Sequence, residues 1–194
     1  MNTPNTLTLI RIIASPLFLI FFAINTAWSI FVCLILLIIF ELTDFYDGRL
    51  ARQKNLITDF GKLMDPFADS ISRFTIFLCF LSANLAPVWI IAIFFYRDVF
   101  VAILRVFAIR ENVVVSARKS GKVKAWFQGG STAPVLVIYF LQKIDVLPEP
   151  LYVFAEIRLA TLLISLAAIV TLYSGIDYFN GNKHILIRSM ERKS

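Results

Sequence analysis

The chain has 194 residues, of which 59% are hydrophobic, and its mean hydropathy is +0.78. This composition is too apolar for an ordinary soluble domain. The formal net charge of +6 does not require a nucleic-acid partner, because anionic lipid headgroups and phosphorylated substrates are sufficient to account for it.

Six apolar segments are long enough to be membrane helices, each of which needs about 20 apolar residues. We expect an all-α integral membrane protein, one domain over residues 1–194, with helices at roughly 7–25, 28–48, 64–84, 87–108, 124–142 and 150–178. The first segment lacks a small-x-small cleavage site and contains Arg11 and Pro16, which argues against a signal peptide. Cys33 and Cys79 fall inside predicted helices and are expected to be packing residues.

Lysine and arginine gather at the N-terminus, in the 48–62 and 109–124 loops and in the C-terminal tail. The only basic residue in the other predicted loops is Lys143. Because basic loops stay on the cytoplasmic side, we expect a multi-pass protein of the inner (plasma) membrane with both termini in the cytoplasm.

Thr8 and Arg11 open the first predicted helix, and two interpretations of them remain open. Arg11 can be an interfacial anchor whose charged head reaches the membrane surface. Alternatively, Thr8 and Arg11 can face a substrate site.

The stretch DFYDGRLARQKNLITDFGKLMDPFAD, residues 44–69, joins the second and third predicted helices. Asp44 and Asp47 are three residues apart, and Asp65 and Asp69 are four apart, so each pair lies on one face of a helix. If the two helices are antiparallel, four carboxylates converge. One or two divalent cations would relieve the repulsion, and oxygen ligands favour Mg²⁺, Mn²⁺ or Ca²⁺ over zinc.

A short polar loop is expected between the two pairs, and it contains Gly48, Arg49, Arg52, Lys54, Gly61 and Lys62. Its small residues allow a ligand to approach the backbone, and its basic residues suit phosphate. Metal ions beside a phosphate-binding loop indicate phosphoryl transfer. The simpler alternative is that these aspartates are only solvated at the membrane surface.

Charged residues also interrupt the fourth predicted helix. Arg97 and Asp98 lie deep in an apolar run, and Arg105 follows two turns later. They can form an internal Arg–Asp pair, or Arg97 and Arg105 can line a phosphate pocket. We expect Gly121 to break the chain before Lys122 and Lys124 open the fifth helix.

Near the end of the chain the polar residues have simpler interpretations. We expect Gln128, Gly129 and Gly130 to allow close helix packing. Asp177 is expected to be interfacial, and His184, the single histidine, to lie in a solvated tail.

The 44–69 stretch resembles the signature of the CDP-alcohol phosphatidyltransferase family, D-x-x-D-G-x-x-A-R-x(8)-G-x-x-x-D-x-x-x-D. Each fixed position of that signature is matched here, by Asp44, Asp47, Gly48, Ala51, Arg52, Gly61, Asp65 and Asp69. The P-N-x-L-T-x-x-R start, the Arg-Asp block and the G-K-x-K block resemble the phosphatidylglycerophosphate synthase branch. That branch has a threonine where this chain has Ala125.

The resemblance implies six membrane helices around a polar cavity open to the cytoplasm, commonly in a homodimer. It implies transfer of a phosphatidyl group from CDP-diacylglycerol to an alcohol, with release of CMP. The implied ligands of two Mg²⁺ or Mn²⁺ ions are Asp44, Asp47, Asp65 and Asp69, and Asp69 is also the implied general base. The implied donor-nucleotide site consists of Asp47, Gly48, Ala51, Arg52 and Gly61.

A second basic cluster suggests an acceptor with its own phosphate, for which we expect sn-glycerol 3-phosphate. The residues expected to bind it are Thr8, Arg11, Arg97, Arg105, Lys122 and Lys124. Three alternatives remain open: another acceptor such as inositol phosphate, serine or a lipid; a divalent-cation transporter; and an inactive lipid-binding homologue.

Overall fold

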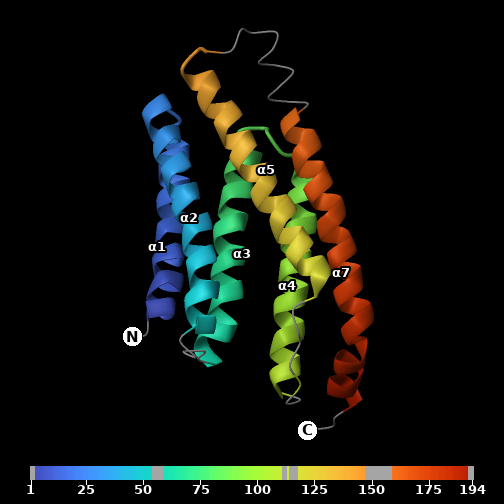
Figure 1. The fold of residues 1–194 in the computed structure, drawn as a ribbon. Coiled ribbons are helices and arrows are strands. Elements are labelled where there is room, and N and C mark those ends of the chain that lie inside the picture. Colours follow the sequence, from blue (N-terminus) through green and yellow to red (C-terminus); the bar gives the residue numbers. More distant parts are fainter. Residues whose placement is uncertain (1–2, 54–58, 111–112, 114–117, 147–158, 192–194) are drawn as a thin grey trace.

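The computed structural model describes residues 3–53, 59–110, 113, 118–146 and 159–191. For residues 3–8, 44–53, 59–66, 109–110, 186 and 188–191 it describes the backbone alone. Within these ranges the chain forms six α-helices and no strands, so the all-α class is confirmed there. The helices are α1 (Thr3–Ile24), α2 (Ala27–Gln53), α3 (Asp59–Ser82), α4 (Val88–Arg110), α5 (Lys119–Lys143) and α7 (Ala160–Glu191) (Figure 1).

Each apolar segment overlaps a helix, but two expected breaks and the expected end at 178 are wrong. Helix α7 continues to Glu191, so His184, which was expected in a solvated tail, is an exposed residue of this helix. Gly48, Arg49 and Arg52 lie in α2, and Gly61 and Lys62 lie in α3, so most of the expected 48–62 loop is helical. Gly121 lies in the first turns of α5. One glycine costs a helix only about 1 kcal/mol, and the good helix formers around each glycine compensate. The first part of the last expected segment, 150–158, lies outside the described residues.

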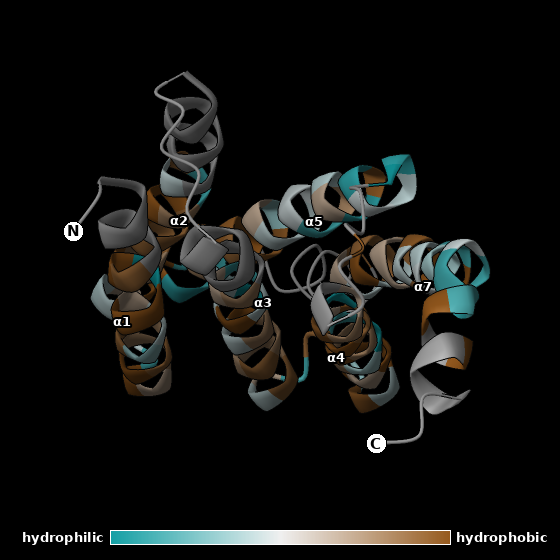
Figure 2. Ribbon diagram, turned by 90° about the horizontal axis from the view of Figure 1, so that it is seen from below, coloured by the Kyte–Doolittle hydropathy of each residue, from teal (hydrophilic) through white to brown (hydrophobic). Residues whose placement is uncertain are grey.

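The six helices form a closed ring. Contacts run from α1 to α2, then to α5, α7, α4 and α3, and from α3 back to α1 (Figure 2). Helices α1 and α2 are therefore separated from α4 and α7 by α3 on one side and α5 on the other. Side chains that point inward from any of the six helices can meet in the centre of the ring.

Both termini lie at one end of the ring, called here the lower end, as Figure 1 shows. At the upper end, the described turns are short and contain Asn25, Asn84 and Asp145 with φ between 53° and 60°. Asn and Asp adopt this left-handed conformation more readily than other non-glycine residues. Tyr139 of α5 donates a hydrogen bond to Asn25 Oδ1 at 2.7 Å, which ties the α1–α2 turn to α5.

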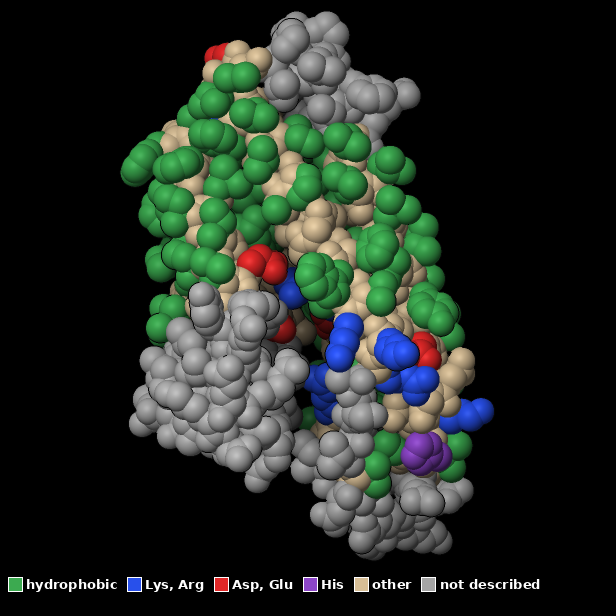
Figure 3. All heavy atoms as spheres, viewed as in Figure 1, with side chains coloured by type: hydrophobic (Ala, Val, Ile, Leu, Met, Phe, Trp, Pro, Cys, Tyr) green, Lys and Arg blue, Asp and Glu red, His purple; other side chains and the backbone are tan. Residues whose placement is uncertain are grey.

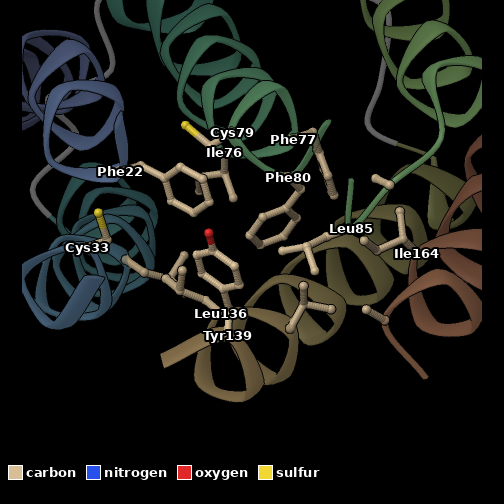
Figure 4. Close-up of a cluster of buried hydrophobic side chains, with 14 of the residues drawn as sticks. Phe22, Cys33, Ile76, Phe77, Cys79, Phe80, Leu85, Leu136, Tyr139 and Ile164 are labelled. Atoms are coloured by element: carbon tan, nitrogen blue, oxygen red, sulfur yellow. The ribbon is translucent and has the colours of Figure 1, made fainter. Parts of the chain in front are cut away.

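The upper half of the ring, called here the apolar half, encloses an aromatic core. Figure 4 shows the rings of Phe22, Phe80 and Tyr139 facing one another from α1, α3 and α5. The Phe22 and Tyr139 centroids are 5.4 Å apart, and all three side chains are buried. Cys33 and Cys79 are free and buried in the same core, which confirms the expectation that they are packing residues (Figure 4).

The lower half, called here the polar half, has a different interior. Charged or polar side chains from α1, α3, α5 and α7 are buried there. They include Arg11, Ser72, Lys124, Gln128, Thr171 and Ser174. Figure 2 views this end and shows hydrophilic residues on α5 and on the C-terminal part of α7.

The outer surface of the ring is strongly apolar. Exposed Ile, Leu, Phe and Trp side chains cover its upper part, whereas lysine and arginine gather on its lower part (Figure 3). Among the described residues, only Ala160–Ile185 of α7 is long and apolar enough to cross a membrane by length and composition. Leu9–Ile24 and Ala27–Thr43 are shorter apolar stretches.

Candidate active site

The Asp44–Asp69 stretch lies on the lower ends of α2 and α3. Its backbone is helical from Asp44 to Gln53 and from Asp59 to Asp69. Each predicted carboxylate pair therefore belongs to one helix, at the spacing that places both members on one face. The side chains of seven signature residues lie outside the description: Asp44, Asp47, Gly48, Ala51, Arg52, Gly61 and Asp65.

Asp69 is the signature aspartate whose side chain is described. Arg11 of α1 donates a hydrogen bond from Nη1 to Asp69 Oδ1 and forms an ion pair with it. The side chain of Arg11 is 2% exposed and that of Asp69 is 33% exposed. The interpretation of Arg11 as an interfacial anchor is therefore wrong: its charge is buried against a signature carboxylate 58 positions away.

A second ion-pair cluster joins α4 to α5. Lys124 donates from Nζ to Asp98 Oδ1 at 2.7 Å and to Asp98 Oδ2 at 2.9 Å. Arg97 donates from Nη1 to Asp98 Oδ1 at 2.9 Å. The internal Arg–Asp pair, one of the two interpretations left open by the sequence, is confirmed. The predicted basic cluster thus contains a carboxylate between two of its cations.

Arg97 extends this cluster to α7. Its Nη2 donates to Ser174 Oγ at 2.7 Å, and its guanidinium carbon lies 5.1 Å from the centre of the Tyr178 ring. A Cβ on Gly175 would lie 3.2 Å from Arg97 Cγ, so the glycine is what allows the arginine stem to pass close to α7. Asp98 and Arg97 together connect three helices of the ring.

Further polar contacts line the interior between these two ion pairs. Arg73 of α3 donates from Nη1 to the Ala125 carbonyl at 2.9 Å. Gln128 of α5 donates from Nε2 to Thr171 Oγ1 at 3.3 Å. Within the described part of the chain, Gln128 Oε1 and Arg97 Nε are buried without a hydrogen-bond partner. The polar half therefore retains unused hydrogen-bonding capacity.

The other residues expected to bind the acceptor are placed differently. Arg105 is half-buried on α4, two turns below Arg97, and Lys122 is exposed on α5. The side chain of Thr8 lies outside the description. The structure thus brings together Arg97 and Lys124 around Asp98, and it brings Arg11 to Asp69.

Asp177, which was expected to be interfacial, is held in an ion pair with Arg118. It accepts two hydrogen bonds from Arg118, at 2.7 Å from Nε and 2.6 Å from Nη2, and a further one from Ser120. The Arg118 backbone N–H also donates to Tyr178 Oη at 3.2 Å. The hydrogen bond with Asp177 raises the pKa of Arg118, which keeps the guanidinium charged. This pair fixes the start of α5 against α7.

The close helix packing expected at Gln128, Gly129 and Gly130 is confirmed for Gly129 and wrong for Gly130. A Cβ on Gly129 would lie 3.1 Å from Glu41 Oε1, whereas a Cβ on Gly130 would meet nothing within 4 Å. Gly121 has a packing role of the same kind, since its Cβ would lie 3.0 Å from Tyr178 Oη. These close approaches join α5 to α2 and to α7.

Sequence reasoning missed the partners of Lys124 and Arg118. Asp98 and Asp177 are 26 and 59 positions from these cations, and their contacts depend on which helices are neighbours. The available signal was a carboxylate inside an apolar run, since such a residue needs a partner. Ser174 offered little signal, because a serine in a helix can bond to its own backbone.

No group of three or more His, Cys, Asp or Glu side chains that could hold a metal is present among the described residues. The side chains of three of the four predicted ligands, Asp44, Asp47 and Asp65, are not among those described. For the four predicted metal ligands, the structure describes the helical backbone that carries them and their position at one end of the ring. It describes one of their carboxylates, that of Asp69, which is partly exposed.

Comparison with known proteins gives consistent matches. The family model described as CDP-alcohol phosphatidyltransferase matches residues 1–176. A Bacillus subtilis protein named CDP-diacylglycerol–glycerol-3-phosphate 3-phosphatidyltransferase is 33% identical over 193 residues, which cover 93% of this chain and 95% of that protein.

Two further relatives carry the same name. The one from Pectobacterium atrosepticum is 29% identical, with 96% of this chain and 97% of that protein covered. The one from Rickettsia felis is 28% identical, with 94% and 96% covered. The matches therefore extend over nearly the whole length of each protein.

Proposed function

The chain belongs to the CDP-alcohol phosphatidyltransferase family and is an enzyme of that family. On this premise we propose that it transfers a phosphatidyl group from CDP-diacylglycerol to sn-glycerol 3-phosphate and releases CMP. The observation that supports the acceptor most strongly is the largely buried Arg97–Asp98–Lys124 cluster, in which two cations share one carboxylate. The name shared by the full-length relatives points to the same acceptor.

We propose that all six helices cross the membrane and that the lower end of the ring faces the cytoplasm. The exposed apolar side chains around the upper part support this, because soluble monomers rarely expose apolar patches above a few hundred Å². The basic side chains at the lower end, where both termini lie, support the orientation. A water-soluble acceptor and a lipid donor can both reach a site there.

The family generally depends on divalent metal ions, and this chain has a suitable set of oxygen donors. We assign Asp44, Asp47, Asp65 and Asp69 as the ligands of two Mg²⁺ or Mn²⁺ ions. Their spacing on helical backbone and their all-carboxylate chemistry fit hard cations. When bound, such ions supply Lewis-acid neutralisation of the donor pyrophosphate.

The chain's own residues then have separate tasks. Asp69 accepts the proton of the acceptor hydroxyl as its oxygen bonds to the phosphatidyl phosphorus and the bond to CMP breaks. A general base of this kind typically contributes 10²–10⁴-fold to the rate. Arg11, buried beside Asp69, holds the orientation of the Asp69 carboxylate through their ion pair. The donor nucleotide is assigned to Asp47, Gly48, Ala51, Arg52 and Gly61.

The phosphate of the acceptor is assigned to the basic residues of the polar half. Arg97, Arg105 and Lys124 lie on α4 and α5, and Arg11 and Thr8 lie on α1. Lys122 is exposed beside them and suits attraction of the acceptor from water. Charge-assisted hydrogen bonds from such groups are about twice as strong as neutral ones, which favours an acceptor that is itself a phosphate.

The test is CMP release by the purified protein with CDP-diacylglycerol, Mg²⁺ or Mn²⁺, and a panel of acceptors. We expect release with glycerol 3-phosphate and not with glycerol, serine or inositol phosphate. Release with inositol phosphate or serine instead would keep the family chemistry and refute the acceptor. Metal uptake into vesicles without CMP release would favour a transporter.

A further inference from the structure

Asp98 lies at the centre of the polar half, and the sequence signature does not include it. Its carboxylate accepts two hydrogen bonds from Lys124 and one from Arg97, at 2.7 to 2.9 Å. Ser70 Oγ of α3 lies 3.5 Å from its Oδ2. The side chains of Asp98, Arg97 and Lys124 are 14%, 11% and 8% exposed. These groups therefore interact away from most of the screening by water.

The cluster holds a surplus of positive charge. Two cations share one carboxylate, so the three groups sum to one unit of positive charge in a poorly solvated place. Buried charges are normally paired, and a surplus of one sign favours a ligand of the other sign. An ionised phosphate is the ligand whose charge and oxygen acceptors match such a surplus.

Hydrogen-bonding capacity remains on both cations. An ammonium has three N–H donors, and within the described residues the hydrogen bonds of Lys124 go to Asp98 alone. Arg97 Nε is buried without a hydrogen-bond partner in the described part of the chain. Both cations can therefore hold Asp98 and still donate to another anion.

The two cations differ in how they are fixed. Arg97 is held on the α7 side by Ser174, Tyr178 and the close approach at Gly175. Lys124, on a flexible four-carbon stem, is fixed at its charged end by Asp98. Asp98 thus determines the direction of Lys124 more than that of Arg97.

We propose that Asp98 is a positioning residue that aims Lys124, and with it Arg97, at the phosphate of the acceptor. This inference rests on the proposed function and adds a residue outside the signature to its acceptor site. Asp98 does not itself contact the substrate. Its loss would leave Arg97 held by Ser174 but would leave Lys124 without a fixed direction, so the acceptor and not the donor would bind more weakly.

The test measures initial rates for Asp98→Asn and Asp98→Glu in the full-length protein, varying each substrate in turn. We expect Asp98→Asn to raise the KM for glycerol 3-phosphate at least about tenfold, because hydrogen bonds to charged groups contribute that much. The KM for CDP-diacylglycerol should stay within about twofold of the wild-type value, because the hydrogen bonds lost in this variant orient the acceptor site and not the donor site. Asp98→Glu, which keeps the charge, should recover part of the loss.

The matched control is Asp177→Asn, which removes the carboxylate of the Arg118–Asp177 ion pair near the middle of α7. It should leave both KM values unchanged. A double-mutant cycle with Lys124→Met tests the mechanism: Asp98→Asn should add little to the acceptor KM of Lys124→Met if it acts through Lys124. Additive effects would overturn the inference.

Three other outcomes are decisive. Equal rises in both KM values, or an unchanged acceptor KM, would mean that Asp98 is only a structural link. If Asp98→Asn does not fold, Asp98→Glu carries the test, and an unchanged acceptor KM in that variant would also overturn the inference. If the wild type uses an acceptor without a phosphate, the proposed function fails, and this inference fails with it.

Discussion

The two halves of the ring are built from the same six helices but differ in what they enclose. The apolar half encloses Phe22, Phe80 and Tyr139, whose rings pack against one another. The polar half encloses two ion-pair clusters, one at Arg11 and one at Asp98. Aromatic pairs contribute about 0.5–1.5 kcal/mol each beyond their burial, so the apolar half favours stability directly.

Buried ion pairs have a different energetic balance. Removing charges from water costs several kcal/mol each, and replacing such pairs with apolar residues is often neutral or stabilising. The polar half is therefore a poor way to hold helices together and a good way to bind charged substrates. This contrast assigns stability to one half and chemistry to the other, and each prediction below tests that division.

Among the predicted substitutions, Asp69→Asn should have the largest effect on activity. We expect kcat to fall at least about 10²-fold, because the carboxylate would no longer accept the acceptor proton. The variant should also unfold at a lower temperature, since the ion pair between Arg11 and Asp69 is lost. Activity per folded molecule, measured by CMP release, separates the two effects.

Two matched variants support that measurement. Asp145→Asn changes an exposed carboxylate with φ of 53°, a conformation that asparagine tolerates, and should behave as the wild type. Arg11→Met in the Asp69→Asn background should restore stability without restoring activity. An active double variant would refute the assignment of Asp69.

Phe80→Ala should show the opposite pattern. Phe80 is fully buried and packs against Phe22 and Phe77, so its truncation should destabilise the fold by about 3–5 kcal/mol. The kcat and KM of the molecules that remain folded should match the wild type. Thermal unfolding in detergent gives the first quantity, and CMP release per folded molecule gives the second. Phe127→Ala, at an exposed phenylalanine, is the control.

Gly175→Ala should have a smaller effect, and that effect should be on acceptor use. The added Cβ would lie 3.2 Å from Arg97 Cγ and push the stem of an arginine already held by Ser174 and Asp98. A rise of roughly threefold in the acceptor KM is expected, because small misplacements weaken a preorganised site.

Gly130→Ala is the control for Gly175→Ala, because its Cβ would meet nothing within 4 Å. It should leave the kinetics unchanged and stabilise α5 by up to about 1 kcal/mol. Equal kinetic effects of the two substitutions would show that helix composition, and not the position of Arg97, explains the change.

Arg118→Gln should have the smallest effect. Its ion pair with Asp177 is partly exposed to water, so the unfolding temperature should fall by no more than about 2 °C. The difference in unfolding temperature between the wild type and the variant should become smaller at high salt, because salt screens exposed ion pairs. A large loss of activity in Arg118→Gln would instead show that this ion pair takes part in catalysis or substrate binding.

The sequence predicted where the helices lie better than it predicted which helices contact each other. Apolar runs placed the helices because each needs a lipid-compatible length, but the ends were missed where glycine and charged residues continue a helix, as at Gly48 and Gly121. The order of the ring could not be predicted, because an apolar run does not specify its partner. For the same reason the pairings of Lys124 with Asp98 and Arg118 with Asp177 were missed.

The signature told more about chemistry than about geometry. It identified Asp69, which the structure places beside Arg11, but the convergence of Asp44, Asp47 and Asp65 on Asp69 stays a prediction. At Arg97 and at Arg11 the sequence left two interpretations, and at both positions the structure supplied a carboxylate partner. A charged residue inside an apolar run was thus the most informative single signal.

One measurement tests the central claim most directly: transfer of radiolabelled glycerol 3-phosphate into lipid by folded wild-type protein supplied with CDP-diacylglycerol and Mg²⁺ or Mn²⁺, beside Phe80→Ala and Asp69→Asn. We predict one labelled lipid per CMP released, the wild-type rate per folded molecule for Phe80→Ala, and almost none for Asp69→Asn. CMP release without labelled lipid, or full activity of Asp69→Asn, would contradict the assignment of the chemistry to the polar half.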